Sequence, residues 1–367
     1  MNPYISRLEQ QARELLPASV YDYYAGGSGR ERTLAANEQA WDRTWLAPRV
    51  LRDVSAVDTG TALLGAPVTT PLAVAPTGFH RLAHPEGEVA TAAGAARAGA
   101  LFVLSTRSTR RIEDVAAVAG PWWFQVYIMR ERAHTARLVR RAAAAGASAL
   151  VLTADTPEVG RKRRVSDDLD IPDEDAYANL GPVADESGTD QAPDVTMADI
   201  GWLTEISGGL PVVVKGVLRP DDALACAAAG AAGVLVSNHG GRQLDGALPT
   251  ARALPRIAAA LSAGPLPGMA TTSELPAGRT SATGAADGIP AYVDGGIRSG
   301  EDALAALALG ARAVLLGRPV LWALTCGGAD GVAELLTSLT DGLAHAMALA
   351  GAATLADVAG VAAQPDR

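Results

Sequence analysis

The sequence is poor in cysteine, in long apolar runs and in net positive charge. Its 367 residues include two cysteines, Cys226 and Cys326, each in a separate alanine-rich segment. Two scattered thiols cannot build a disulfide framework or a cysteine-based metal site, so we expect both to be buried and reduced, and we predict no metal. The formal net charge of −9 argues against nucleic acid or an anionic membrane as the main partner. An anionic ligand would need a locally basic pocket.

The chain also lacks targeting and membrane-spanning features. No apolar run reaches the length of a transmembrane helix, and residues 1–11 are polar where a signal peptide would have an apolar core. The proportions of hydrophobic residues, 49%, and charged residues, 19%, are typical of a soluble globular protein. These features predict a cytoplasmic protein without a membrane partner.

From residue 71 onward, short apolar runs alternate with alanine-rich segments of helical period. The runs cover residues 72–75, 101–104, 123–127, 149–153, 212–215, 233–236, 291–294 and 313–316. This alternation predicts an α/β fold of parallel strands and crossover helices, and eight units in about 250 residues is the size of a TIM (β/α)8 barrel. A doubly wound open sheet is the alternative. It would not explain why polar residues follow nearly every run, whereas in a barrel those strand ends share the face that carries active sites.

The remaining segments divide the chain further. Residues 1–70 are predicted to form an N-terminal helical cap, with helices at 6–16 and from 20 onward, followed by an irregular crossing to the barrel at 71–351. The connection after the fourth strand, about 156–200, is long enough to be functional or disordered. Residues 262–288 are rich in Gly, Ala, Pro, Ser and Thr and are predicted to be a flexible insertion without a function. Residues 352–367 form a C-terminal tail.

The stretch 234–245 carries the clearest chemical signal. A buried strand ends at Val236 and is followed by His239 and Arg242, three residues apart, so both side chains could point into one pocket. Histidine can accept a proton near neutral pH, and arginine can clamp a carboxylate with two parallel hydrogen bonds. Taken alone, the pair could equally be a capping histidine and a solvated loop arginine.

Two glycine-containing turns follow the seventh and eighth strands. They are Asp294-Gly295-Gly296, with Arg298 two residues later, and Gly317-Arg318. Glycines let backbone N–H groups approach an anion, and these two loops are the recurrent phosphate site of TIM barrels. Each turn alone could be an ordinary strand-to-helix connection. Lys215, at the end of the fifth strand, must find a negative partner or shift its pKa if it is buried there.

Together these motifs resemble the FMN-dependent 2-hydroxy acid oxidase and dehydrogenase family, which includes glycolate oxidase, lactate oxidase, mandelate dehydrogenase and hydroxymandelate oxidase. The resemblance covers residues 21 to about 351. It implies FMN as the cofactor, a small 2-hydroxy acid as the substrate, and O₂ or another electron acceptor. It also implies a homo-oligomer, either a tetramer or an octamer.

The resemblance assigns roles to individual residues. It implies that His239 is the base, that Asp155 pairs with it, and that Arg242 binds the substrate carboxylate. Tyr23 and Tyr127 match the family tyrosines that hydrogen-bond the substrate. Lys215 matches a lysine beside the flavin ring. The implied FMN contacts are Pro76, Thr77, Gly78, Ser105, Gln125, Thr153, Lys215, Ser237, Asp294, Gly295, Gly296, Arg298, Gly317 and Arg318.

The sequence departs from the family pattern at two substrate-binding positions. Lys162 stands where the family has an arginine that joins in carboxylate binding, so either Lys162 replaces it or Arg161 or Arg163 does. Arg107 stands where relatives similar to glycolate oxidase place an aromatic residue near the substrate side chain. Arg107 therefore indicates either a substrate with a second anionic or polar group or a solvated loop residue.

Gly78 bears on the electron acceptor. Oxidases of the family usually carry alanine at this position, and several dehydrogenases and a monooxygenase carry glycine. We expect modest reactivity with O₂, with a dehydrogenase or monooxygenase outcome also open.

The sequence thus predicts FMN-dependent oxidation of an L-2-hydroxy acid to the 2-oxo acid. The alternatives are another FMN barrel enzyme, similar to IMP dehydrogenase or isopentenyl diphosphate isomerase, and a catalytically silent flavin-binding barrel. The first lacks support because no cysteine nucleophile falls on a barrel-face loop.

Overall fold

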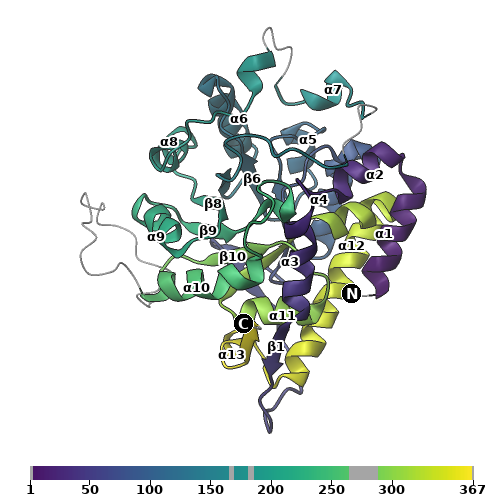
Figure 1. Ribbon diagram of the computed structural model, residues 1–367, viewed down its shortest axis with the longest axis vertical. Helices are drawn as coiled ribbons and strands as arrows, with labels where there is room; N and C mark the ends of the chain where they lie inside the picture. Colours follow the sequence, from purple (N-terminus) through teal and green to yellow (C-terminus); the bar gives the residue numbers. More distant parts are fainter. Residues whose placement is uncertain (1–2, 165–168, 181–185, 264–287, 366–367) are drawn as a thin grey trace.

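A computed structural model describes residues 3–164, 169–180, 186–263 and 288–365. Within these ranges, eight parallel strands close into a barrel in the order β10-β11-β4-β5-β6-β7-β8-β9 (Figure 1). The strands are β4 (Leu72–Val74), β5 (Leu101–Leu104), β6 (Trp122–Val126), β7 (Leu150–Thr153), β8 (Val212–Val217), β9 (Gly233–Val236), β10 (Ala291–Asp294) and β11 (Ala311–Leu316). Each overlaps one of the predicted runs. The TIM barrel prediction is confirmed, and the open-sheet alternative was wrong.

Helices surround the barrel because each crossover returns the chain to the start of the next parallel strand. They are α4 (Glu88–Arg97), α5 (Ile112–Ala116), α6 (Arg132–Ala144), α8 (Ala198–Ile206), α9 (Pro220–Ala228), α10 (Thr250–Ala263), α11 (Gly300–Ala308) and α12 (Arg318–Leu349). The last bends at Gly328, whose φ of 55° interrupts the helical geometry. None of the helices in the described ranges is long and apolar enough to cross a membrane.

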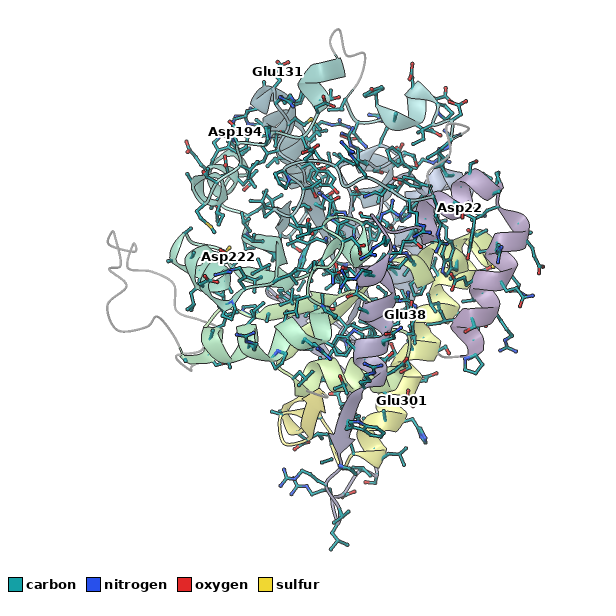
Figure 2. The ribbon with its side chains drawn as sticks, viewed as in Figure 1. Asp22, Glu38, Glu131, Asp194, Asp222 and Glu301 are labelled. Carbon is teal, nitrogen blue, oxygen red and sulfur yellow. The ribbon has the colours of Figure 1, made fainter. Side chains whose placement is uncertain are left out.

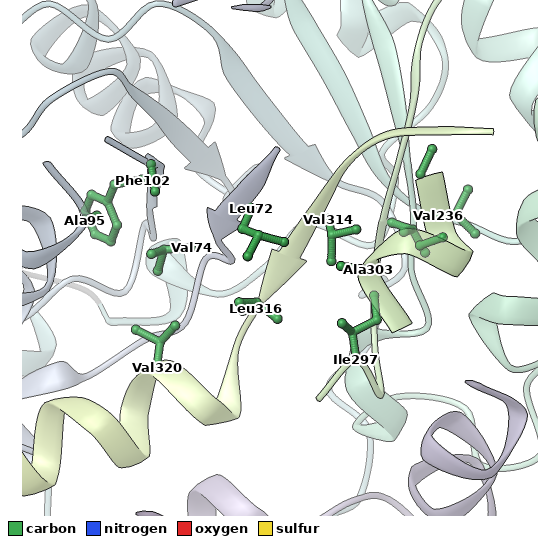
Figure 3. Packing of buried hydrophobic residues seen from close by; sticks show 14 of the residues in the cluster. Leu72, Val74, Ala95, Phe102, Val236, Ile297, Ala303, Val314, Leu316 and Val320 are labelled. Atoms are coloured by element: carbon green, nitrogen blue, oxygen red, sulfur yellow. The ribbon is translucent and has the colours of Figure 1, made fainter. Parts of the chain in front are cut away.

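The strands bury both faces, which explains why they appear in the sequence as continuous apolar runs. Leu72 and Val74 of β4 face the surrounding helices, where they pack with Leu316 and Val320 (Figure 3). Ala73, between them, faces the barrel interior, as the two-residue period of a strand requires. The interior contains Trp123 and Tyr292 in an edge-to-face contact, and residues of the hairpin β2 (Thr61–Leu63) and β3 (Ala66–Val68) pack against this inner core.

The N-terminal segment contains α1 (Pro3–Leu15) and α2 (Ala18–Ala25), which correspond to the predicted helices. The crossing that follows is not irregular as predicted, because α3 (Arg32–Asp42) lies within it. The buried face of α3 includes Thr33 and Asn37 beside Ala40 and Trp41, so half of it is polar and an apolar period does not reveal it. Beyond α3, β1 (Thr44–Ala47) pairs antiparallel with β12 (Ala362–Pro365) of the tail, which also holds α13 (Leu355–Val358).

The long connection after β7 pairs with other segments at two points, Lys162 with Ser28 and Gln191 with Met129. Its described parts contain α7 (Asp173–Ala176) and the 3-10 turn η2 (Glu186–Thr189). The insertion predicted at 262–288 lies outside the described residues except at its ends, and α10 runs to Ala263. Both cysteines are free thiols; Cys226 is buried, and Cys326 is half-buried rather than fully buried as expected.

Candidate active site

The carboxyl ends of the barrel strands surround a cavity of about 510 Å³. This volume falls within the roughly 300–1,000 Å³ typical of small-molecule and cofactor sites. The predicted site residues that line it are Tyr23, Pro76, Thr77, Gly78, Ser105, Arg107, Tyr127, Lys162, Lys215, His239, Arg242, Asp294, Gly295, Gly296, Arg298, Gly317 and Arg318. Gln125, Asp155 and Ser237 are not part of the lining but form hydrogen bonds with residues that are. Thr153 is also outside the lining; it pairs with Lys215 across β7 and β8 and accepts from Gln125.

The loops after β10 and β11 lie across the barrel from those after β6 and β7. We call the part of the wall formed by Gly295, Gly296, Arg298, Gly317 and Arg318 the glycine end. The part formed by Tyr23, Arg107, Tyr127, Lys162, His239 and Arg242 is the histidine end.

At the histidine end, His239 is held between a carboxylate and a phenol. Its Nδ1 lies 3.0 Å from Oδ1 of Asp155, and its Nε2 lies 3.5 Å from the hydroxyl of Tyr127. Since an ionised carboxylate only accepts hydrogen bonds, Nδ1 carries the proton and Nε2 keeps a lone pair facing Tyr127. The backbone of His239 has a φ of 57°, in the left-handed region, and its N–H donates to the hydroxyl of Ser237. Such a conformation is uncommon outside glycine and is often found at functional sites.

Electrostatics keep His239 neutral and Asp155 ionised. Burial, the charge of Lys215 and that of Arg242 together lower the pKa of His239, and Asp155 only partly opposes them. Burial alone would raise the pKa of Asp155, but the charge of Lys215 and the hydrogen bond from His239 outweigh it and hold that pKa well below its usual range. A neutral imidazole beside a fixed carboxylate is a base whose charged form is stabilised once it takes a proton.

Gly216 lets Asp155 reach this position. It has a φ of 104°, and a Cβ there would lie 2.5 Å from the Cβ of Asp155. A larger residue would therefore displace the carboxylate from the imidazole.

The phenols and Arg242 form the adjacent wall. Burial raises the pKa of both Tyr23 and Tyr127, so their hydroxyls stay protonated and can donate. The guanidinium of Arg242 lies 5.0 Å from the ring centre of Tyr23. Its Nη1 donates to the backbone oxygens of Tyr23, Tyr24 and Gly26, at 2.5, 3.4 and 3.0 Å. These bonds leave from one terminal nitrogen and fix the orientation of the whole fork.

Of the three candidate basic residues after β7, Lys162 is the one that lines the cavity. Its Nζ donates to the backbone oxygen of Arg242, whereas Arg161 and Arg163 are exposed. Burial and the charges of Arg242 and Arg318 lower the pKa of Lys162 to about 8.

At the glycine end, backbone without side chains, at Gly295, Gly296 and Gly317, lines the cavity. Gly295 and Gly296 have φ values of 91° and 87°, and a Cβ on Gly296 would lie 2.5 Å from the backbone of Asn37. Arg318 donates from Nε, Nη1 and Nη2 to the backbone oxygens of Tyr24, Gly240 and Gly26, each at 3.0 Å.

The unexpected helix α3 supports this end. Glu38 accepts from Arg298 at 2.7 Å, and Figure 2 shows Glu38 on α3. The indole of Trp41 donates to the backbone oxygen of Gly295 at 2.8 Å, and Asn37 exchanges two amide hydrogen bonds with Asn238, at 2.9 and 2.7 Å. Sequence reasoning missed these three residues, because the partners they bind are more than 200 positions away.

Lys215 has the negative partner that its buried position requires. It is 4% exposed, and its Nζ lies 3.8 Å from Oδ2 of Asp294. Burial raises the pKa of Asp294, against the influence of Lys215, and Oδ1 of Asp294 is buried without a hydrogen-bond partner. Behind them, Gln125 donates to Thr153 at 2.9 Å and accepts from Ser105 at 3.2 Å.

These features fit the predicted FMN. The cavity has the required volume, the glycine end offers backbone N–H groups and two arginines for a phosphate, and Asp294 has an unpartnered buried oxygen facing a ligand-sized space. The described residues contain no cluster of His, Cys, Asp or Glu able to hold a metal ion.

Known proteins match the chain over almost its full length. A profile of the family described as FMN-dependent dehydrogenase matches residues 12–364. The chain is 41% identical to a 4-hydroxymandelate oxidase of Amycolatopsis orientalis, covering 95% of this chain and 94% of that protein. It is 42% identical to an L-lactate oxidase of Nostoc sp., with coverages of 95% and 94%. A crystal structure of mandelate oxidase superposes with a TM-score of 0.87 at 41% identity and covers 98% of each chain.

These matches agree with the resemblance found in the motifs and favour it over the two other FMN barrel families considered. The chain therefore belongs to the FMN-dependent 2-hydroxy acid oxidase and dehydrogenase family, which includes lactate, glycolate and hydroxymandelate oxidases.

Proposed function

We propose that this enzyme oxidises an L-2-hydroxy acid to the 2-oxo acid, with His239 as the base. The observation that carries the proposal is the arrangement of His239 between Asp155 and Tyr127 in the cavity wall. The substrates named for the relatives, 4-hydroxymandelate and L-lactate, are 2-hydroxy acids and support the same reaction class.

The charge of each side chain determines the role that we assign to it. Arg242 and Lys162 hold the substrate carboxylate, and the protonated hydroxyls of Tyr23 and Tyr127 donate to the substrate. Nε2 of His239 takes a proton from the substrate, and the ionised Asp155 stabilises the imidazolium that results. Lys215 lines the same cavity beside Asp294, its partner at 3.8 Å, and supplies a positive charge there.

Bound FMN would accept the two electrons that leave the substrate. Gly295, Gly296, Arg298, Gly317 and Arg318 would hold its phosphate. The contacts proposed around its ring are Pro76, Thr77, Gly78, Ser105, Gln125, Thr153, Lys215 and Ser237, and Asp294 begins the loop proposed for the phosphate. The predicted homo-oligomer and cytoplasmic location stay predictions.

The proposal is tested with the purified yellow holoenzyme in the absence of air. L-2-hydroxy acids should bleach the flavin, and His239→Asn should keep FMN but slow bleaching by roughly 10² to 10⁴-fold, as expected for an essential acid–base group. His345→Asn, at an exposed position on α12, is the matched control and should behave as the parent does. Bleaching at an unchanged rate in His239→Asn would refute the assignment. A parent that no 2-hydroxy acid bleaches would be a silent flavoprotein.

A further inference from the structure

Arg107 lines the cavity at the histidine end, in a turn that follows β5. Its backbone N–H donates to the hydroxyl of Ser105 at 3.1 Å, and its backbone oxygen accepts from Phe79 at 2.9 Å. The side chain is half-buried, and the turn is fixed on both sides. A cation here is therefore built into the wall and is not a freely solvated loop residue.

The charge of Arg107 acts on the same two phenols as that of Arg242. Burial raises the pKa of Tyr23 and of Tyr127, and the positive charges of Arg242 and Arg107 both oppose that rise. Both guanidinium groups and both phenols line the same cavity. Two guanidinium groups thus act on the place where the substrate is proposed to bind.

Arg107 has few partners for its charge. Its Nη2 donates to the backbone oxygen of Thr189 at 3.3 Å, a long hydrogen bond. Within the described ranges it forms no ion pair, in contrast to Arg298, which lies 2.7 Å from Glu38. A half-buried guanidinium with one weak neutral contact would be stabilised strongly by an anion.

A second polar group without a partner lines the same cavity. Gln191 contributes to the wall, and its Oε1 is buried without a hydrogen-bond partner. The segment around it is fastened to the end of β6, since Ala192 donates to Ile128 and Arg130 donates to Asp190, each at 2.8 Å. The backbone around Gln191 is thus held in place, and a half-turn of its side-chain amide replaces the unpartnered Oε1 with the NH₂ group, which can donate to a carboxylate.

We propose that Arg107 and Gln191 form a second anion subsite and that the preferred substrate is a 2-hydroxy dicarboxylate. This inference rests on the proposed function, because the carboxylate next to the hydroxyl is assigned to Arg242 and Lys162. The distal carboxylate then binds the fork of Arg107, with the amide of Gln191 beside it. A neutral or aromatic side chain in the same place would cover the guanidinium without pairing its charge.

Substrate pairs matched in carbon number test the subsite. L-malate is compared with L-2-hydroxybutyrate, and L-2-hydroxyglutarate with L-2-hydroxyvalerate; (S)-mandelate serves as the aromatic substrate. kcat/KM is measured from anaerobic flavin bleaching in the parent, Arg107→Met, Arg107→Lys and Arg312→Met. Arg312 is exposed on β11, outside the cavity lining, and is the matched control.

The parent should prefer each dicarboxylate to its neutral match. Arg107→Met should lower kcat/KM for the dicarboxylates by about 10- to 100-fold, as expected for losing a charge-assisted hydrogen-bonded pair, and should change the neutral substrates little. For the dicarboxylates, kcat/KM of Arg107→Lys should lie between the values of the parent and of Arg107→Met, because lysine keeps the charge but lacks the paired donors of the guanidinium. Arg312→Met should match the parent.

Calorimetric binding of 2-oxoglutarate and 2-oxovalerate to the oxidised holoenzyme separates the subsite from catalysis. Tighter binding of 2-oxoglutarate that disappears in Arg107→Met supports the subsite even if no hydroxy acid bleaches the flavin, in which case the proposed function alone fails. If neutral acids or mandelate bleach the parent and Arg107→Met leaves both selectivity and 2-oxoglutarate binding unchanged, the subsite is wrong and the proposed function stands.

Discussion

The two ends of the cavity use arginine in different ways. At the glycine end, Arg318 makes three hydrogen bonds to backbone oxygens and Arg298 pairs with Glu38, so both side chains are locked in place. At the histidine end, Arg242 is likewise fixed by three backbone oxygens, but Arg107 has one long contact and Lys162 binds a single backbone oxygen. Backbone oxygens orient a cation but leave its net charge available to a ligand. Both arginines of the glycine end are therefore fixed in advance, whereas the histidine end combines the fixed Arg242 with Arg107 and Lys162, whose few contacts leave room for bonds to a substrate.

Among the substitutions that test this comparison, Arg318→Met should have the largest effect. The change removes the bonds that tie the end of α2, at Tyr24 and Gly26, to the turn at Gly240. Leaving a buried oxygen unpaired costs roughly 1–3 kcal/mol, and Arg242 still reaches two of the three, so we expect a loss of about 1–3 kcal/mol. Urea unfolding should show this loss, and the flavin absorbance per protein should fall sharply.

Arg312→Met is again the control for removing an arginine. If Arg318→Met bound as much FMN as the parent and unfolded at the same urea concentration, Arg318 would neither stabilise the fold nor belong to the phosphate site.

The barrel could be predicted because its strands are buried on both faces. Runs such as 101–104 and 233–236 are apolar at every position, and the polar residues that follow them mark one face of the barrel. The same logic placed His239, Lys215 and Asp294 at strand ends, where the structure brings them into one wall.

The supporting contacts could not be predicted in the same way. Asn37 finds Asn238 at a separation of 201 residues, and nothing local to α3 indicates that partner. Because Thr33 and Asn37 are buried polar residues satisfied by tertiary contacts, their helix lacks a clear apolar stripe. Likewise, only the folded loop shows that Lys162, and neither Arg161 nor Arg163, reaches the cavity wall.

The titration of Lys162 provides a pH test of substrate binding at the histidine end. Its pKa of about 8 means that the amine is charged below pH 8 and neutral above it, so carboxylate binding should weaken as the pH rises through 8. The pKa of His239 is lowered and those of Tyr23 and Tyr127 are raised, which leaves Lys162 as the group of the histidine end that titrates near pH 8. At the glycine end, burial and the charges of Arg242 and Arg298 lower the pKa of Arg318 to about 9, so the range from about pH 7 to 8.5 is the informative one. KM for a monocarboxylic substrate should rise by about tenfold between the charged and the neutral form of Lys162, the effect of losing roughly 1.4 kcal/mol of binding.

Lys162→Arg should keep KM low and flat across the same range, because arginine stays charged. Lys162→Met should give a high and flat KM. A rise in KM of the same size in the parent and in Lys162→Arg would assign the titration to another group.

The smallest expected effect links Gly78 to both the acceptor and the second anion subsite. A Cβ at position 78 would lie 3.0 Å from the Cβ of Arg107, which is tight enough to displace that side chain by a few tenths of an ångström. Gly78 is not among the glycines with positive φ, so alanine is compatible with the backbone. The resemblance implies that this residue lies beside the reactive edge of the flavin, where an added methyl also changes the space open to O₂. We expect Gly78→Ala to change the rate of reoxidation about two- to fivefold and to lower the preference for dicarboxylates by a similar factor.

Mixing reduced enzyme with oxygenated buffer, with peroxide and decarboxylated product quantified, measures the first effect, and the matched substrate pairs measure the second. Gly201→Ala on α8, where an added Cβ meets open space, is the control. If the reduced parent is reoxidised rapidly with stoichiometric peroxide and Gly78→Ala reacts at the same rate, Gly78 does not limit the reaction with O₂. If only the dicarboxylate preference then changes in Gly78→Ala, the effect of this residue is on Arg107.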